Sequence, residues 1–538
     1  MKSKLNLSII IILLIVTGCS ESFLDNPPKG SFSEDVFYKT EDAGIKSVIG
    51  CYTPMLNHWD YQVMWYDVGN IITDDSNKGG SDAGDGIRKT EVGIGKPLPT
   101  NAMLNSLWTH RFNAIGKCNT ALENITMETP LIHKGGTYVS DAEKARYIAE
   151  IKFLRGFYYY DLATVFGGVP LITTTLTPEE KSTLTKASID EIKAQILSDV
   201  QACIDESNMP SSASLSEEEF GRITKDIANA FKARVLLFFG DYAEAKDAAW
   251  KVIETGTFEL QPDYQELFNS YGNGFYSKES VFTILREYRP GYTGSSVIPQ
   301  MNTGRNNLGG WGGDCPTQDL VDEYELGDAR LIHTVIQDQD EFMKNDGTIE
   351  VHNYTGYDNN TGYHSRKAYV PHQRRPDGGF WQVDWTFYLI RYSDVLLMYA
   401  ESLLESGGDK QEVADYINMV RRRAFLTTSR EDSWAHKRQI VIPEVTEAEF
   451  EANYAVKATD DLLAAIKHER RVELGMEGLR YYDLMRWDDF VSTMNAFSKL
   501  PYANGKGSKV DDQTWPYPIP QTEIDRTGGS ITQNPGYN

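Results

Sequence analysis

The stretch KARYIAEIKFLRGFYYYDLATVF, residues 144–166, decides the fold class of this chain. Apolar side chains recur in it at spacings of three and four residues, the period of an α-helix, and further aromatic rings widen the apolar stripe. The sequence GGVP at 167–170 ends this pattern, because glycine and proline both disfavour continuation of a helix. We therefore predict a long helix that is buried on most of its sides.

Helical hairpins are predicted in four segments, at about 144–205, 224–256, 391–424 and 460–487. In the second segment Thr224 can cap the first helix, GDY at 240–242 turns the chain, and alanines on the return helix permit close packing. This spacing resembles a tetratricopeptide repeat. Because such hairpins cannot bury their apolar faces alone, we expect them to stack into one scaffold that is discontinuous in sequence. The predicted fold class is mainly α, with loop-rich insertions and short strands.

Two further regions, at about 60–110 and 258–385, lack a helical period and are rich in Gly, Asn, Asp, Tyr and Trp. We interpret them as loops with short strands. Polar loops that carry aromatic residues on a rigid helical frame are common places for binding sites. These two segments are therefore the predicted ligand-loop regions.

The first nineteen residues have the pattern of a bacterial lipoprotein signal. Lys2 and Lys4 precede an apolar run at 5–16, and VTGC ends at Cys19. The apolar run is too short for a permanent membrane helix, which needs about 20 residues. We predict a signal peptide at 1–18, a lipidated tether at 19–30 and a single domain at 31–538. The alternative is an ordinary cleaved signal peptide in which Cys19 is incidental.

Acylation of Cys19 would attach the protein to outer-membrane lipid. Glu21 and Asp25, which follow closely, resemble the surface-export signals of some Gram-negative lipoproteins. We therefore expect the protein to face the cell exterior.

Composition and motif content exclude several classes of function. The net charge of −24 opposes any electrostatic grip on nucleic acid. No nucleophile elbow, phosphate-binding loop or zinc-protease motif is present, which argues against the corresponding enzymes. The 77 acidic residues leave open a glycan hydrolase, which needs only two carboxylates. Cys51, Cys118, Cys203 and Cys315 are too widely spaced for a metal motif, and any disulfide pairing among them stays open.

Several segments together resemble the SusD/RagB family of outer-membrane nutrient-binding lipoproteins, over nearly the whole chain. They are VTGC at 16–19, AEIKFLRGFYYY at 149–160, FGGVP at 166–170, the hairpin at 224–256, RYSDVLLMYAE at 391–401, ERRVEL at 469–474, RYYDL at 480–484, YPIP at 517–520 and QNPGY at 533–537.

The resemblance implies a SusD-like helical protein that captures a nutrient, most often an oligosaccharide, and delivers it to a partner SusC-like TonB-dependent outer-membrane transporter. It implies binding without catalysis. Peptide capture, as in RagB-like relatives, and a surface glycan hydrolase remain the alternatives. Independently of the family, we expect Arg155, Arg391, Arg470 and Arg471 to tie helices together, since they lie on predicted helices among carboxylates and aromatic rings.

A glycan site needs aromatic platforms for the flat faces of sugar rings and polar groups for their hydroxyls. Both loop regions supply such residues, and in the family ligand contacts come from these two zones. The candidate ligand-binding residues are Trp65, Asp74, Asp75, Asn77, Arg88, Arg286, Tyr288, Tyr292, Arg305, Asn306 and Trp311. For Trp311, flanked by glycines, the alternative is an indole wedged beneath a loop.

A calcium ion is a further possibility in the first loop region. Asp75 and Asn77, with Ser81, Asp82 and Asp85 nearby, offer the hard oxygen ligands that calcium prefers. The EF-hand pattern fails, however, because Gly86 occupies the position of its last glutamate. We therefore predict no metal or other cofactor, with calcium as the open alternative.

Overall fold

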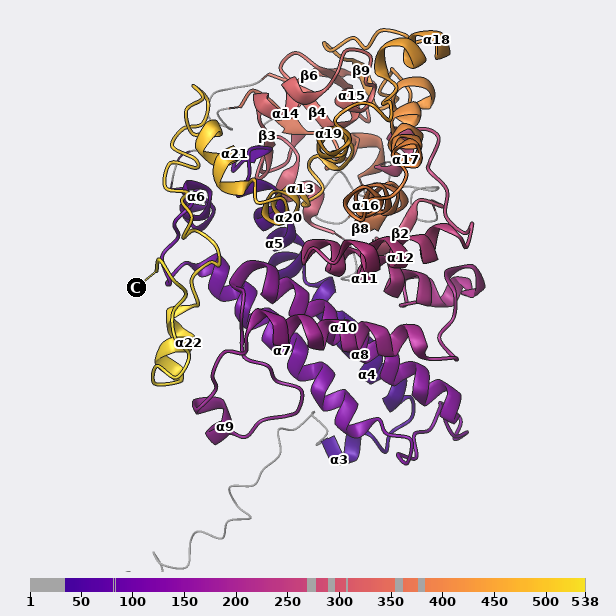
Figure 1. Ribbon diagram of the computed structural model, residues 1–538, viewed down its shortest axis with the longest axis vertical. Helices are drawn as coiled ribbons and strands as arrows, with labels where there is room; N and C mark the ends of the chain where they lie inside the picture. The colour runs from indigo at the N-terminus through magenta and orange to yellow at the C-terminus, as the bar shows by residue number, and fades with distance from the viewer. Residues whose placement is uncertain are drawn as a thin grey trace, which may run out of the picture.

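Helix α8 (Asp141–Phe166) lies within a stack of helices (Figure 1). It begins with a capping box between Ser140 and Glu143, and Gly167 follows its last residue with a φ of 68°. Most of its side chains from Lys144 onward are buried. The prediction of a long helix buried on most sides is confirmed.

The computed structural model describes residues 34–80, 82, 84–268, 277–288, 296–305, 308–353, 361–375 and 383–537. Cys19 and the tether at 19–30 lie outside them.

The stack runs through seven helices, each of which packs on the next. In order they are α7 (Ala102–Asn124), α8, α10 (Ile189–Asp205), α11 (Lys225–Phe238), α12 (Tyr242–Ile253), α16 (Tyr392–Glu405) and α17 (Lys410–Arg422). The contact between α12 and α16 joins hairpins that the central region separates in sequence, and α19 (Leu462–Leu474) covers both α16 and α17. The expected mainly α, discontinuous scaffold is therefore confirmed.

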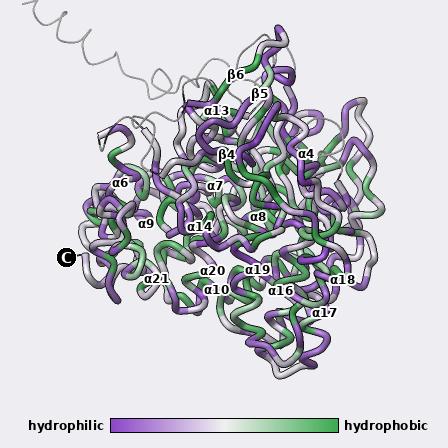
Figure 2. The backbone as a smooth tube through the Cα atoms, turned by 90° about the horizontal axis from the view of Figure 1, so that it is seen from above, coloured by the Kyte–Doolittle hydropathy of each residue, from purple (hydrophilic) through white to green (hydrophobic). Residues whose placement is uncertain are grey.

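Shorter helices and turns surround the stack. The α-helices are α3 (Glu34–Phe37), α4 (Ala43–Tyr52), α5 (Val63–Tyr66), α6 (Ile87–Ile94), α9 (Pro178–Ser182), α13 (Ile298–Asn302), α14 (Gln318–Glu323), α15 (Arg330–Thr334), α18 (Glu447–Glu449), α20 (Arg480–Arg486), α21 (Phe490–Phe497) and α22 (Gln521–Arg526). The 3-10 and π turns are η1 (Thr53–Leu56), η2 (His58–Gln62), η3 (Asp67–Ile71), η4 (Ser212–Ser214), η5 (Glu217–Glu219), η6 (Tyr264–Leu267), η9 (His372–Arg374), η11 (Arg423–Thr427) and η12 (Phe450–Tyr454). Hydropathy alternates along many of these segments (Figure 2).

The first predicted loop region, 60–110, is helical over much of its length. The turns η2 and η3 flank α5 without a break, and α6 and the start of α7 also fall inside the region. The segment from η2 to η3 is buried along one side through four apolar residues, Val63, Met64, Val68 and Ile71. These apolar residues recur at helical spacing. The prediction of a loop was wrong here because it relied on the surrounding residues, which are rich in Gly and Asn.

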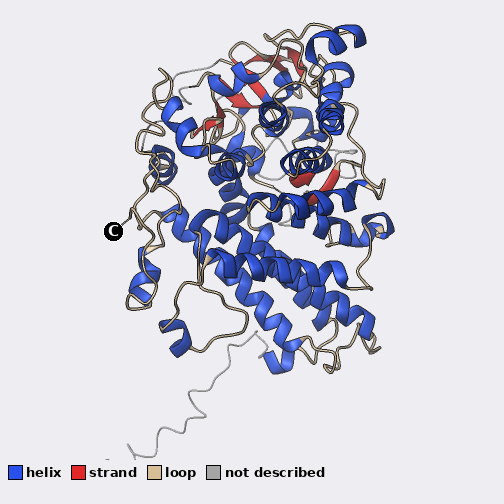
Figure 3. Ribbon diagram, in the orientation of Figure 1, coloured by secondary structure: helices blue, strands red, loops and turns tan. Residues whose placement is uncertain are grey.

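The strands are short and pair antiparallel (Figure 3). The pairs are β1 (Ser76–Asn77) with β3 (Cys315–Pro316), β2 (Ser280–Arg286) with β8 (Trp385–Arg391), β4 (Val335–Gln337) with β7 (Tyr363–Ser365), and β5 (Glu341–Met343) with both β6 (Ile349–Val351) and β9 (Ala435–Lys437). Most belong to the central region, as expected. The β1–β3 pair joins the N-terminal loop region to the central one.

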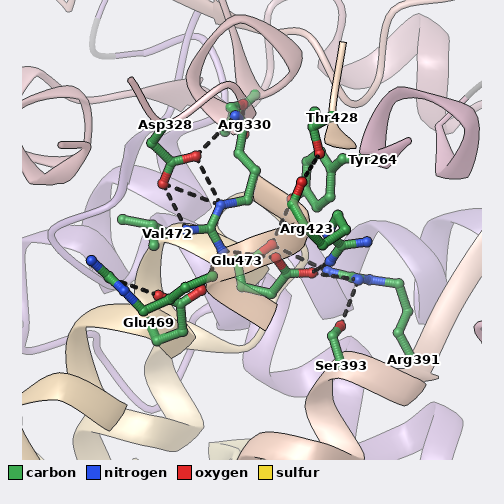
Figure 4. A network of polar contacts seen from close by, with 12 residues as sticks. Tyr264, Asp328, Arg330, Arg391, Ser393, Arg423, Thr428, Glu469, Val472 and Glu473 are labelled. Carbon is green, nitrogen blue, oxygen red and sulfur yellow. Dashed lines mark hydrogen bonds and ion pairs between the residues drawn. The ribbon is translucent and has the colours of Figure 1, made fainter. Parts of the chain in front are cut away.

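Buried arginines tie the central region to the helices. Glu473 on α19 accepts hydrogen bonds from Arg330 at 2.9 Å, Arg391 at 2.8 Å and Arg423 at 2.5 Å (Figure 4). Arg330 also pairs with Glu469 at 2.6 Å. We call these five residues the arginine–glutamate junction. Although burial alone would raise the pKa of Glu473, the three guanidinium groups hold it well below its usual value.

The other arginines expected to tie the scaffold together are also buried. Arg155 makes a two-pronged contact with Asp199 at 2.9 and 2.8 Å. Arg470 bridges Asp394 and Asp483. These contacts join helices and confirm the structural interpretation. The cysteines at 51, 118, 203 and 315 are buried and are not paired in disulfides.

Candidate ligand-binding site

Two tryptophans form an exposed aromatic surface at the border of the two loop regions. Trp59 in η2 is 39% exposed and Trp311 is 36% exposed. Their ring centroids lie 6.0 Å apart, with 31° between the ring planes. Large aromatic side chains are normally covered in a folded protein, so a neighbouring exposed pair is a candidate for stacking against a ligand. We call Trp59 and Trp311 the tryptophan platform.

The backbone around Trp311 is held in place by the end of α13. Trp311 donates its N–H to the carbonyl of Gln300 at 2.7 Å, and Gly312 donates to Thr303 at 2.8 Å. A Cβ at Gly310 would collide with the Thr303 carbonyl, so this close approach requires a glycine. The ring of Trp311 is thus presented by a fixed loop, not wedged beneath it.

A polar rim borders the platform. Arg305 donates from Nε to the carbonyl of Trp311 at 2.7 Å and pairs with Asp85 at 2.7 Å. Lys78 donates to the backbone carbonyls of Asp82 and Asp85. Partial burial lowers the pKa of Lys78, although the two nearby carboxylates oppose this shift. The rim therefore places cationic donors and carboxylate acceptors next to exposed rings, as recognition of hydroxyl groups requires.

Backbone contacts hold the two loop regions together at this place. Besides the β1–β3 pair, Gly79 packs so closely on Gly312 that a Cβ at Gly79 would collide with the Gly312 carbonyl. The N-terminal loop region and the central one therefore meet beside the tryptophan platform.

Of the candidate residues, Arg305 and Trp311 lie at the platform and its rim. Arg88 is half-buried on α6, shortly after Asp85, and Tyr288 is half-buried after β2 with its N–H donated to Asp384. Tyr292 and Asn306 lie outside the described residues. Ligand contact by any of these side chains stays a prediction.

The structure corrects the assignment of Trp65, Asn77 and Arg286 to an exposed site. All three are buried. Trp65 donates its indole N–H to the carbonyl of Glu477 at 2.9 Å and packs on Tyr482. Asn77 belongs to β1, and Arg286 is 4% exposed at the end of β2. Their aromatic or polar character serves the packing between segments.

Asp74 and Asp75 were also wrongly assigned to the exposed site, because arginines from the C-terminal part of the chain cover them. Asp74 pairs with Arg480 at 2.8 Å and with Arg471 at 2.9 Å, and Asp75 pairs with Arg471 at 2.8 Å. Burial alone would raise the pKa of Asp74, but Arg471 and Arg480 hold it below its usual value. Both carboxylates are thus occupied by structural ion pairs.

The oxygen groups considered as calcium ligands also have other partners in the structure. Asp82 accepts from the N–H groups of Gly84 and Asp85, and the Asp85 side chain pairs with Arg305. Ser81 lies outside the described residues. Within the described part of the chain, no group of three or more His, Cys, Asp or Glu side chains is arranged to hold a metal ion.

Trp59 is the platform residue that sequence reasoning missed. It precedes the predicted loop region by one residue and lies in the sequence HWDYQVMWY, where four aromatic residues give no sign of which one is exposed. The acidic and amide residues near it give no usable signal, because Gln62 and Asp67 close by are themselves buried.

Comparison with known proteins identifies the family. One family model, described as the SusD family, matches residues 332–537, and a second, described as starch-binding and associating with the outer membrane, matches residues 88–237. The chain belongs to the SusD family. None of its described helices is both long and apolar enough to cross a membrane.

Related SusD family proteins align over nearly the full chain. SusD-like protein P2 of Formosa agariphila is 24% identical and covers 99% of this chain and 100% of its own. The structure of surface glycan-binding protein A from Bacteroides fluxus has a TM-score of 0.74 at 24% identity, over 93% and 100% of the two chains. A SusD-like carbohydrate-binding protein from Bacteroides fragilis has a TM-score of 0.72 at 26% identity, over 91% and 99%.

Proposed function

We propose that this SusD family protein captures a glycan at the cell surface by stacking sugar rings on the tryptophan platform. The observation that carries the proposal is the exposed pair of Trp59 and Trp311, bordered by Arg305 and Asp85. Sugar rings present flat C–H faces and a girdle of hydroxyls, which match this combination of rings, cation and carboxylate. The descriptions of the family model and of the similar structures, which refer to starch, glycan and carbohydrate binding, support the same class of ligand.

The wider role that we propose is nutrient uptake. The protein is anchored in the outer membrane through acylated Cys19, faces the exterior, and passes an oligosaccharide to a SusC-like TonB-dependent transporter without cleaving it. The lipoprotein-type sequence at 1–19 and the family description, which refers to the outer membrane, support this role.

Calorimetry on the full-length protein in a detergent without a sugar headgroup tests the capture step. The titrants are starch, a soluble β-glucan, their oligosaccharides and a set of peptides. We expect micromolar to millimolar affinity for a glycan, about −8 to −4 kcal/mol, and recovery of the ligand uncleaved. Binding of peptides alone would favour a RagB-like role, and shortened products would favour a hydrolase.

The double variant Trp59→Ala/Trp311→Ala tests the site. We expect it to bind the glycan at least about tenfold more weakly, since exposed tryptophans in a binding site carry a large share of the binding energy. Trp250→Ala is the matched control. Trp250 on α12 is 38% exposed, as the platform tryptophans are, but its ring packs on Tyr399 of α16. Equal affinities for the two variants would show that the platform does not contact the glycan.

Purification of the protein from its native outer membrane in mild detergent tests the transporter partnership. We expect a large barrel protein to co-purify with it in stoichiometric amount. A solitary monomer in every mild detergent would contradict the partnership while leaving glycan capture intact.

A further inference from the structure

A concave site lies apart from the residues of the tryptophan platform. It is a cavity of about 410 Å³ lined by residues of α7, of the segment 170–184 that includes α9, and of α22. Its lining contains none of the residues of the tryptophan platform or its rim. Volumes of this order are usual for sites that hold small molecules.

The walls of this cavity are fixed to one another by hydrogen bonds. Asn119 on α7 donates from Nδ2 to the carbonyls of Ile172 at 3.0 Å and Thr174 at 3.3 Å. Arg526 on α22 donates to the carbonyl of Lys181 at 2.9 Å. The three segments are therefore connected around the cavity, through the buried side chain of Asn119 and the exposed side chain of Arg526.

Gly116 leaves the floor of the cavity open. It lies in the interior of the long helix α7, where glycine is an unfavourable residue. A Cβ built at this position would meet no heavy atom within 4 Å. No neighbouring atom therefore requires a glycine at position 116. The missing side chain leaves open space on this side of α7, one helical turn after Phe112.

Aromatic rings and polar groups face each other across this space. Trp108 and Phe112, one helical turn apart, have ring centroids separated by 4.8 Å. Although Trp108 is only 2% exposed, its indole N–H donates to no other group in the part of the chain that the structure describes. Asn113 on α7 and the ion pair of Arg526 with Glu523, at 2.6 Å, add donors and acceptors at the opening.

We propose that this cavity is a second, independent ligand site, which takes a small neutral sugar of one or two pyranose rings. A pyranose can lie with its C–H face on the half-buried ring of Phe112 while its hydroxyls meet the indole N–H of Trp108, the Asn113 amide and the Arg526–Glu523 pair. The lining carries the Arg526–Glu523 pair and Lys181, which together give a net charge of only +1, and its volume of about 410 Å³ is too small for a polysaccharide. The site does not depend on the tryptophan platform and holds whether or not that platform captures glycans.

The test uses the full-length Trp59→Ala/Trp311→Ala protein, in which the platform is removed. Methyl glucoside, maltose, cellobiose and lactose are titrated by calorimetry in a detergent without a sugar headgroup. We expect at least one of them to bind with a millimolar dissociation constant. If none of the four binds, the proposal is wrong.

Gly116→Met, added to the same protein, identifies the cavity. A methionine on α7 projects into the open space and is compatible with a helix, so we expect binding to weaken about tenfold or more while folding is preserved. Gly50→Met is the matched control, since Gly50 lies in helix α4 and its Cβ would likewise meet no atom within 4 Å. Equal affinity in the two variants would overturn the proposal, whereas loss only with Gly116→Met supports it.

Discussion

The tryptophan platform and the arginine–glutamate junction are made from the same kinds of residue, yet they differ in their access to water. At the platform rim, the side chains of Arg305 and Asp85 are 29% and 42% exposed. In the junction, Arg330 and Glu473 are fully buried. An exposed pair is solvated and can exchange its partner for a ligand, whereas a buried pair is committed because separating it leaves an uncompensated charge. Burial, more than residue type, separates binding chemistry from structural chemistry in this protein.

The largest expected effect comes from removing the shared carboxylate of the junction. Glu473→Gln leaves three buried guanidinium groups without their common anion, so the free energy of unfolding should fall by about 3–5 kcal/mol. Urea denaturation followed by circular dichroism measures it. A change below about 1 kcal/mol would mean that the junction behaves like the exposed rim.

The same substitution made at a buried tryptophan and at an exposed one gives the second test. Trp65→Phe leaves the carbonyl of Glu477 without its indole donor in a buried place, which should cost about 1–3 kcal/mol of stability. Trp311→Phe at the platform should change stability by no more than about 0.5 kcal/mol. The same denaturation experiment compares them, and similar losses for both variants would contradict the distinction.

His468 on α19 is intermediate in burial between the platform rim and the junction. Its side chain is 23% exposed and hydrogen-bonded to Glu323 and Glu325. Burial alone would lower the pKa of His468, but the two glutamates raise it to about 9. Because the folded state holds this proton more tightly than the unfolded chain does, the stabilisation is complete below about pH 6.5 and is lost as the pH rises through 9.

We therefore expect the wild-type protein to lose about 1–2 kcal/mol of stability between pH 6.5 and pH 9 through this group, after allowance for its partial exposure. His468→Gln should remove that part of the pH dependence. Unfolding free energies of the two proteins across this range provide the measurement. Parallel curves for wild type and variant would show that His468 does not titrate as described.

The smallest effect is expected at the platform rim. Asp85→Asn breaks the exposed pair with Arg305 and should reduce stability by less than about 1 kcal/mol, with the difference shrinking further at high salt. Thermal unfolding at low and high ionic strength measures it. A loss comparable to that of Glu473→Gln would show that the rim is part of the structural framework.

The parts of the fold that sequence predicted are those with local signals. The helix at 144–166 shows its period and its stop within a single stretch, and Thr224 caps its helix through the N–H of Ile227 three residues later. Trp311 and Arg305 lie in a glycine-rich loop, where side chains commonly face solvent, and both are partly exposed.

The site residues that were assigned wrongly have partners far away in sequence. Asp75 meets Arg471 across 396 residues, and Trp65 meets Glu477 across 412 residues. Nothing near Asp75 or Trp65 in the sequence announces these contacts. A polar or aromatic residue in a loop therefore has the same local pattern whether it will face a ligand or a distant arginine.

The sequence by itself determined the mainly α scaffold, the resemblance to the SusD/RagB family and the prediction of an acylated Cys19, because helical period, capping and motif spacing are properties of short segments. Only the tertiary structure decided which charged and aromatic side chains are buried. It covered Asp74 and Asp75 with C-terminal arginines, and it placed Trp59 beside Trp311. The physical reason is that solvent exposure depends on which distant segments pack together, and exposure decides whether a side chain can bind a ligand.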